Sequence, residues 1–388
     1  MGFDLQWLLV GLPLTFALGW LASRLDLRQW KREQSDSPKT FYKGLNLLLN
    51  EQHDKAIDAF IEAVQHDPDT SDLHFALGNL FRRRGEFERA VRVHEHLLNR
   101  ADLPRTERDR AQHALAQDFF KAGLFDRAEA AYRALDGTTF DTEARLALLA
   151  LHERSRDWHA AVDVARQLES RGTGSFASRI AHYWCEISLE ADAKYRPHEA
   201  ENALKQAREA APRAARPLVL VGQRAARRGD HAEVLSVWGA LMVTHPGAFN
   251  LVAREYAQSA LANDVNATGS AAGALERLRE LHAQAPTMDL LEALALLDPA
   301  PARQRARLLA QLRSHPTLSV VRAVVTQAET ASFDIAETKA LNDAIGRAAR
   351  PLHRYRCAAC GFEAQHYFWQ CPGCLGWDSY PPQRLEDL

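Results

Sequence analysis

Glycine and proline are scarce in this sequence, and neither sign of charge prevails. The 388 residues include only 20 Gly and 16 Pro, and β-branched residues show no regular alternation, which argues against a β-sandwich or a β-barrel. Lys plus Arg total 48 and Asp plus Glu total 50, so the formal charge is −2 and a general nucleic-acid binder is excluded. The length favours several domains or a repeat array. We therefore expect a mostly helical protein that does not bind nucleic acid.

Motifs of the common enzyme classes are also missing. Sixteen histidines occur without an H-E-x-x-H pattern, and the sequence has no G-x-S-x-G, no Walker loop and no dinucleotide-binding fingerprint. Nothing in the sequence supports a hydrolase or a kinase. We expect a protein that is not an enzyme and has no catalytic residues.

Cysteine is rare, and its placement is uneven. One cysteine, Cys185, stands alone beside Trp184 in a helical pattern, where a buried core thiol is the expected role. The other four lie between positions 357 and 374 in two pairs of equal spacing, which is typical of a metal site and not of a disulfide framework. Free thiolates need a reducing compartment, so the C-terminal end is expected in the cytosol.

Long hydrophobic runs are absent except at the N-terminus. The stretch from Leu5 to Ser23 contains no charged residue and is close to the length that a helix needs to cross a bilayer. The leader lacks the basic start and the A-x-A site of a cleaved signal peptide, so residues 1–23 are predicted to be an uncleaved transmembrane anchor. The basic juxtamembrane segment 24–36 follows, and the positive-inside rule places the N-terminus in the periplasm and the bulk of the chain in the cytoplasm.

A 34-residue period begins after this segment. Gly44 and Gly78 are 34 residues apart, as are Ala56 and Ala90. These small residues, with aromatic and proline residues between them, resemble the tetratricopeptide repeat, in which two antiparallel helices form each unit. Residues 37–350 are predicted to hold six clear units and about three degenerate ones, stacked into an all-α superhelix with a concave groove.

The C-terminal segment 351–388 carries the most specific motif of the chain. Two C-x2-C pairs are separated by ten residues, and their members are Cys357, Cys360, Cys371 and Cys374. Such pairs let tight turns present four sulfurs to one metal ion, with no position left open for a substrate. The pattern resembles rubredoxin-like knuckles, although Leu375 stands where the second knuckle normally has glycine. That resemblance favours iron, while zinc ribbons share the geometry, so both metals stay open.

The order of anchor, repeats and knuckles resembles the lipopolysaccharide assembly protein B family of Gram-negative bacteria over the whole chain. This resemblance implies an adaptor in the inner membrane that regulates lipid A synthesis. It implies three protein partners: an FtsH-type membrane protease, the committed-step deacetylase of the lipid A pathway, which the adaptor presents to that protease, and a lipopolysaccharide sensor of the inner membrane.

Two other functions stay open at this stage. A scaffold that coordinates lipopolysaccharide assembly enzymes at the membrane would have the same sequence features. A rubredoxin-type electron carrier would use the metal as a redox centre, and it would need iron and an accessible edge of the site.

Overall fold

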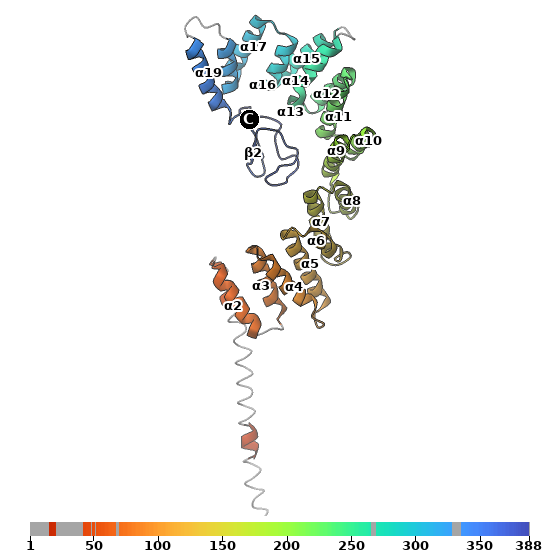
Figure 1. Ribbon diagram of the computed structural model, residues 1–388, viewed down its shortest axis with the longest axis vertical. Coiled ribbons are helices and arrows are strands. Elements are labelled where there is room, and N and C mark those ends of the chain that lie inside the picture. Colours follow the sequence, from red (N-terminus) through yellow and green to blue (C-terminus); the bar gives the residue numbers. More distant parts are fainter. Residues whose placement is uncertain are drawn as a thin grey trace, which may run out of the picture. The chain divides into compact units, whose positions relative to one another are not determined.

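The computed structural model describes most of the chain, in segments 15–20, 42–47, 49–50, 52–66, 70–264, 269–327 and 335–387. The chain divides into two compact units, Met1–Asp157 and Trp158–Leu388. Antiparallel helices make up most of the described residues of both units (Figure 1). The predicted helical repeat fold with a small metal-ribbon segment at the C-terminus is therefore confirmed.

The first unit is built from short helices that pack in sequence order. Residues 42–47 are helical, and the helices that follow are α2 (His53–His66), α3 (Ser71–Arg83), α4 (Phe87–Leu98), α5 (Arg105–Lys121), α6 (Phe125–Arg133) and α7 (Asp141–Ser155). Each helix from α2 to α7 contacts the next one along the chain. This pattern is the one expected of stacked helical pairs.

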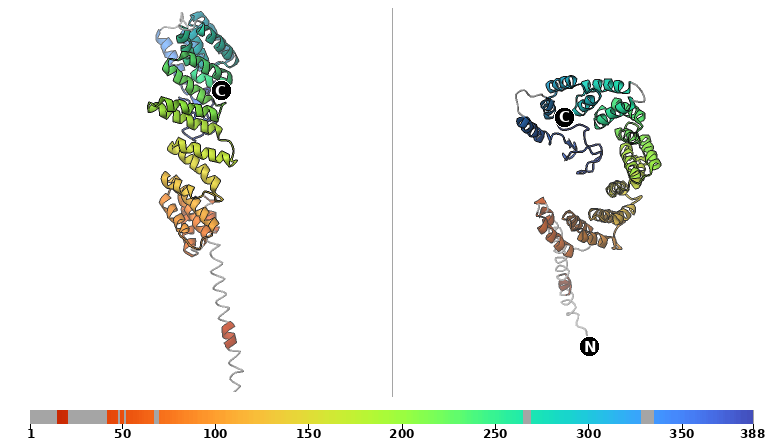
Figure 2. Two further views of the ribbon diagram at one scale, coloured as in Figure 1. Left: turned by 90° about the vertical axis from the view of Figure 1, so that its right-hand side faces the viewer. Right: turned by 45° about the horizontal axis from the view of Figure 1, so that its top comes forward.

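The second unit continues the same pattern and ends in two short strands. Its helices are α8 (Trp158–Ser170), α9 (Ala177–Ala193), α10 (Pro197–Ala210), α11 (Ala215–Arg228), α12 (His231–Thr244), α13 (Pro246–Phe249), η1 (Asn250–Val252), α14 (Ala253–Asp264), α15 (Ser270–Gln284), α16 (Met288–Leu297), α17 (Pro301–Ser314), α18 (Leu318–Gln327) and α19 (Ile335–Ala349). The strands β1 (Tyr355–Arg356) and β2 (Glu363–Ala364) follow and pair antiparallel. Figure 2 shows the C-terminal segment on the inner side of the arc formed by α9 to α18.

Six described helices, α3, α5, α7, α8, α9 and α11, end in the same turn. A residue with positive φ follows each of them, and these residues are Gly85, Gly123, Arg156, Gly172, Tyr195 and Gly229. In each turn the next N–H donates to the carbonyl five residues back, at 2.9 to 3.1 Å. This bond satisfies a carbonyl at the helix end, and the left-handed residue is what brings the N–H into place. Two of the six turns, those at Arg156 and Tyr195, therefore hold a side chain where glycine is the unstrained choice.

We expect Tyr195→Gly to stabilise the second unit by about 0.5–1 kcal/mol. The tyrosine has a φ of 56° and is 93% exposed, so the change removes left-handed strain and loses almost no packing. The urea midpoint of unfolding, followed by circular dichroism, measures the effect. Gly229→Ala is the matched control and should lower the midpoint, because its φ of 75° disfavours a Cβ. A lower midpoint for Tyr195→Gly would contradict this account of the turn.

In three helical pairs, a glycine in the first helix lies directly against an aromatic or imidazole ring of the second helix. The residue that carries the ring follows the glycine by sixteen positions. The pairs are Gly44 with Phe60, Gly78 with His94, and Gly222 with Trp238. A Cβ built on these glycines would lie 3.0, 2.4 and 2.1 Å from the nearest ring atom. The absence of a side chain is therefore what allows the two helices of each pair to approach.

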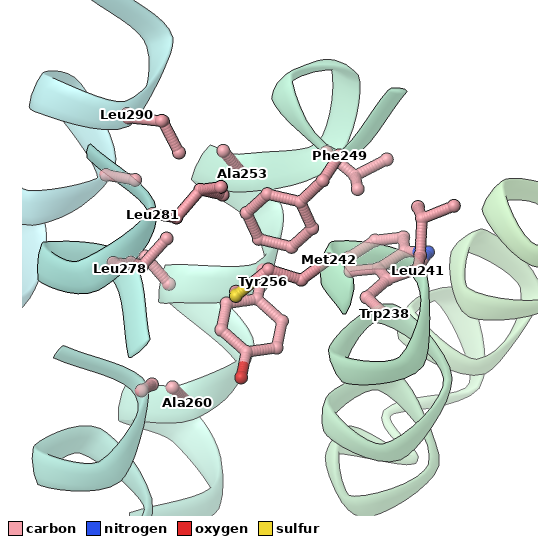
Figure 3. Close-up of a cluster of buried hydrophobic side chains, with 14 of the residues drawn as sticks. Trp238, Leu241, Met242, Phe249, Ala253, Tyr256, Ala260, Leu278, Leu281 and Leu290 are labelled. Atoms are coloured by element: carbon pink, nitrogen blue, oxygen red, sulfur yellow. The ribbon is translucent and has the colours of Figure 1, made fainter. Parts of the chain in front are cut away.

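A large core of the second unit lies between α11 and α16. Trp238, Phe249 and Tyr256 are completely buried there, and leucines from α15 and α16 close the cluster (Figure 3). Phe249, the last residue of α13, packs edge-on against Tyr256 of α14 with ring centroids 5.3 Å apart. Aromatic pairs in this geometry stabilise a core beyond their buried area.

The predicted transmembrane span from Leu5 to Ser23 falls mostly outside the described residues. Residues 15–20 of it are described, and they are helical and exposed. Within the described segments, no helix has both the length and the apolar character needed to cross a bilayer. The basic segment 24–36 also lies outside the described residues, so the anchor and its orientation remain predictions.

Candidate metal centre and its contacts with the repeats

Two tight turns bring the four C-terminal cysteines together. The first turn lies between β1 and β2, which pair Tyr355 with Ala364, and the second is closed by a bridge between Gln370 and Trp377. Each C-x2-C pair is followed by a residue with positive φ, Gly361 at 76° and Leu375 at 59°. The leucine that departs from the knuckle pattern therefore keeps the backbone conformation of the glycine it replaces.

The sulfur atoms are arranged as a single metal ion requires. All four lie within 4.8 Å of one another, with Cys357 Sγ 3.8 Å from Cys374 Sγ and Cys360 Sγ 3.7 Å from Cys371 Sγ. A tetrahedral ion bound at about 2.3 Å holds neighbouring sulfurs about 3.8 Å apart. The donor set and its spacing thus fit one ion of iron or zinc.

The sulfurs differ in exposure and in their hydrogen bonds. Cys357 and Cys371 are buried, while Cys360 and Cys374 are exposed. The backbone N–H of Gly373 donates to Cys371 Sγ at 3.3 Å. Burial raises the pKa of Cys371, but the N–H groups of Cys374 and Gly373 outweigh burial and hold this pKa below its ordinary value. Thiolates are the form that binds a metal, so this arrangement favours binding.

A small aromatic core supports the centre from one side. Tyr355 and Tyr380 are buried with Cys357 and Cys371, and Tyr367 packs against them. Tyr380 Oη donates to the Phe362 carbonyl at 3.2 Å, and Tyr367 Oη donates to the Tyr380 carbonyl at 3.2 Å. Burial raises the pKa of both Tyr367 and Tyr380, so these hydroxyls stay protonated as donors.

Trp377 attaches the centre to the repeats. Its ring stacks on His182 of α9, with centroids 4.6 Å apart and planes inclined by 18°. The same ring meets Trp158 and Tyr183 edge-on at 6.2 and 5.9 Å. Because His182 and Tyr183 are buried, this tryptophan fills a site in the inner face of the array.

Asp378 adds a polar contact beside this ring. Its carboxylate lies 2.7 Å from His182 Nε2 and accepts a bond from Ser178 Oγ at 3.0 Å. Burial raises the pKa of Asp378, but the hydrogen bond with His182 has the opposite effect, and the pKa stays below its ordinary value. The residue has a φ of 51°, so a left-handed backbone turn aims the carboxylate at α9.

Arg216 of α11 completes the contact. It is 5% exposed and pairs with Glu186 at 2.5 Å, and its guanidinium lies 5.8 and 5.7 Å from the ring centroids of Trp369 and Trp377. Trp369 in turn packs against the large core between α11 and α16. The metal segment and the repeats therefore share one continuous packed region in the second unit.

The C-terminal tail extends the contact to later repeats. Arg384 binds Asp289 of α16 at 2.9 and 3.3 Å, and Ser319 of α18 donates to Glu386 at 2.5 to 2.7 Å. The tail also pairs with the start of its own segment, because Leu385 N donates to the Arg354 carbonyl at 2.9 Å. The inner faces of α9, α11, α16 and α18 thus all touch residues from the last part of the chain.

The structure separates the C-terminal aromatic residues into three groups. The sequence predicts that they pack around the knuckles, with docking on the repeats as the alternative for some of them, and Tyr367 and Tyr380 do pack at the knuckles. Trp369 and Trp377 instead dock on the repeats, while Phe362 is 43% exposed and Phe368 is 38% exposed. The docking residues His182 and Arg216 have no motif around them, because their partners lie more than 150 residues away.

Cys185 has the role predicted for it. It is completely buried between α9, α10 and α11, and burial raises the pKa of its thiol to about 12. A thiol with that pKa is almost fully protonated at neutral pH and is a poor nucleophile.

Comparisons with known proteins agree with these features. A family model described as the rubredoxin metal binding domain matches residues 355–381. Lipopolysaccharide assembly protein B of Escherichia coli (strain K12) is 32% identical over 392 residues, which covers 98% of each chain. The protein of the same name from Haemophilus influenzae (strain ATCC 51907 / DSM 11121 / KW20 / Rd) is 27% identical and covers 96% of each chain.

A solved structure, that of YrrB, a TPR protein with an unusual peptide-binding site, has a TM-score of 0.34 and 16% identity, and the match covers 50% of this chain and 96% of that one. The relationship to the Escherichia coli protein is much stronger, because it extends through the repeats and the metal segment alike. This chain belongs to the lipopolysaccharide assembly protein B family.

Proposed function

We propose that this protein is a membrane-tethered adaptor that regulates lipid A synthesis. In this proposal it presents the committed-step deacetylase to an FtsH-type membrane protease and responds to a lipopolysaccharide sensor of the inner membrane. The observation that carries the proposal is the closed set of four sulfurs inside a helical repeat array. Such a site stabilises a fold and leaves no open position for a substrate, while stacked helical pairs offer large surfaces to proteins.

The ligand assignment belongs to the same proposal. Cys357, Cys360, Cys371 and Cys374 would hold one ion, with the buried pair on the side of the repeats and the exposed pair toward solvent. The bound ion would fix the two turns that position Trp369 and Trp377. Its role is structural, and iron and zinc would both serve it.

Tethering gives the adaptor its physical advantage. The predicted span would confine the repeats near the bilayer, where a protease with its own span can meet them. Two weak contacts on one scaffold can raise the overall affinity by a factor of about 10² to 10⁴. We propose that the repeats and the knuckles contact the deacetylase, and that the span and its basic flank face the protease.

Depletion of the protein should lengthen the half-life of the deacetylase in cells and raise the amount of lipopolysaccharide. Quantitative immunoblots after translation is stopped measure the half-life. A chain without residues 1–23 should bind the deacetylase but fail to restore its degradation, whereas the full chain restores it. An unchanged half-life after depletion, while the protease still degrades another substrate, would exclude the adaptor and favour the assembly scaffold.

A further inference from the structure

The inner face of α8, α9 and α11 holds a site whose occupant is the metal segment of the same chain. The Trp377 ring stacks on His182 with centroids 4.6 Å apart. The edges of Trp158 and Tyr183 complete the slot around this ring. The next residue, Asp378, places its carboxylate 2.7 Å from His182 Nε2. The occupant is therefore an aromatic ring followed directly by a carboxylate.

The walls of this site are held by bonds within the repeats. Trp158 Nε1 donates to Glu190 Oε1 at 3.0 Å. Arg216 donates to Glu186 at 2.5 Å and to the His182 carbonyl at 3.5 Å. The metal segment takes no part in these bonds, so the slot keeps its shape when the segment moves away. A site that is already ordered binds more tightly, because less entropy is lost on binding.

The surface under the metal segment has the polar character of a contact that opens. It includes four polar side chains, which are those of Ser178, His182, Glu186 and Arg216. Two buried nitrogens there, His182 Nδ1 and Arg216 Nε, have no hydrogen-bond partner in the described part of the chain. Permanent interfaces are more apolar than those that open and close. This surface can therefore be exposed to water without the cost of a bare apolar core.

The metal segment can move off this site as a folded body. It has a core of its own, formed by Tyr355, Cys357, Cys371 and Tyr380. Its tail is held on α16 by the bonds between Arg384 and Asp289 at 2.9 and 3.3 Å. The tail can therefore act as a pivot while Trp369 and Trp377 leave the repeats.

The backbone at Asp378 narrows the choice of ligand. Its φ of 51° lies in the left-handed region, and its side chain remains 49% exposed. Aspartate tolerates this conformation better than most residues do, because its short polar side chain bonds locally. A ligand that follows the same path should therefore carry aspartate after the aromatic residue.

We propose that this inner-face site binds a partner protein through an aromatic residue followed by aspartate, and that Trp377 and Asp378 are its internal competitor. The partner's ring enters the slot against His182, and its carboxylate accepts hydrogen bonds from His182 and Ser178. Because the competitor belongs to the same chain, its effective concentration is high. Only a partner that is itself held at high local concentration opens the site. This inference does not depend on the proposed adaptor function.

Fluorescence anisotropy with a labelled Leu-Gly-Trp-Asp-Ser peptide and the full metal-loaded chain in detergent tests the proposal. The variant Trp377→Ala/Asp378→Gly removes the competitor, and glycine suits the left-handed φ at position 378. We expect this variant to bind the peptide about tenfold or more tightly than the wild type does. A Leu-Gly-Ala-Asn-Ser peptide should bind neither protein. Metal content by mass spectrometry verifies that the variant keeps its ion.

His182→Ala in this variant should weaken peptide binding by about tenfold or more, because the ring stack and the hydrogen bond to the carboxylate are both lost. His198→Ala, which changes an exposed histidine of α10, is the matched control and should leave binding unchanged. Circular dichroism of both variants verifies that they fold.

Fluorine NMR of the wild-type chain labelled with 5-fluorotryptophan follows the displacement directly. The Trp377 resonance, identified by its absence in Trp377→Phe, should move toward the position of a solvent-exposed indole as the peptide is added. This measurement needs no opened variant, so it decides the question even where Trp377→Ala/Asp378→Gly loses its metal.

Three outcomes would overturn the proposal. They are the absence of saturable binding to the metal-loaded opened variant, equal binding of the two peptides, and an unchanged Trp377 resonance with the peptide in large excess. Light scattering of the wild type provides a further arm. If it shows dimers that the peptide splits, the site exchanges segments between two copies of this chain and the partner proposal fails.

Discussion

A chain with serine in place of both Cys357 and Cys371 should purify without metal and lose the ordered structure of residues 355–381. These two cysteines are the buried pair of ligands. They form the buried core of the segment together with Tyr355 and Tyr380, so the segment has little other apolar core to stabilise it. In small metal-bound segments the free energy of metal binding supplies most of the folding free energy. Metal content by mass spectrometry should fall from one ion per chain to none.

Loss of the metal should also destabilise the repeats of the second unit. Trp369 would leave the large core of the second unit, and Trp377 would no longer stack on His182. The thermal midpoint of the second unit should therefore fall, while the helical circular dichroism signal is largely kept. Proteolysis should cut the variant within residues 355–381 and spare the wild type. His366→Ser, an exposed change in the same segment, is the control and should keep the metal. An ordered, protease-resistant segment in the metal-free variant would refute this account.

Gly222→Ala should destabilise the second unit by roughly 2–3 kcal/mol. The added Cβ would lie 2.1 Å from Trp238 Nε1, a distance that real atoms do not reach. Trp238 cannot move aside, because it is completely buried and its Nε1 donates to the Val219 carbonyl at 3.3 Å. The two helices must therefore separate or the indole must leave its rotamer, and either change weakens the core.

Gly239→Ala is the matched control for this prediction. Gly239 lies in α12, one residue after Trp238, and the nearest atom to its added Cβ is the flexible end of Arg277 at 3.6 Å. The change should stabilise the helix by about 0.5–1 kcal/mol, because alanine loses less backbone entropy than glycine. Urea unfolding of the two variants separates the effects. Equal stability of the two variants would show that the contact at Gly222 does not limit the approach of the helices.

The repeats could be predicted because the residues that define each unit lie close together in the sequence. Gly44, Gly78 and the other small residues recur at the spacing of a helical pair, and each pair needs only its neighbours to bury its apolar face. The same holds for the four cysteines, since two residues between thiols are enough to define a metal-binding turn. The turns at Arg156 and Tyr195 are harder to predict, because they lack the glycine that marks the other equivalent turns.

The sequence by itself therefore determined the helical pairs, the buried position of Cys185 and the cysteine pairs of the candidate metal site. Only the tertiary structure showed that Trp377 stacks on His182, that Asp378 binds the same histidine, and that Arg384 binds Asp289. These contacts join residues that are 195, 196 and 95 positions apart. The periodicity of the sequence does not predict such pairs. They depend on the twist between successive repeats, which together places the inner face of these repeats against the C-terminal segment.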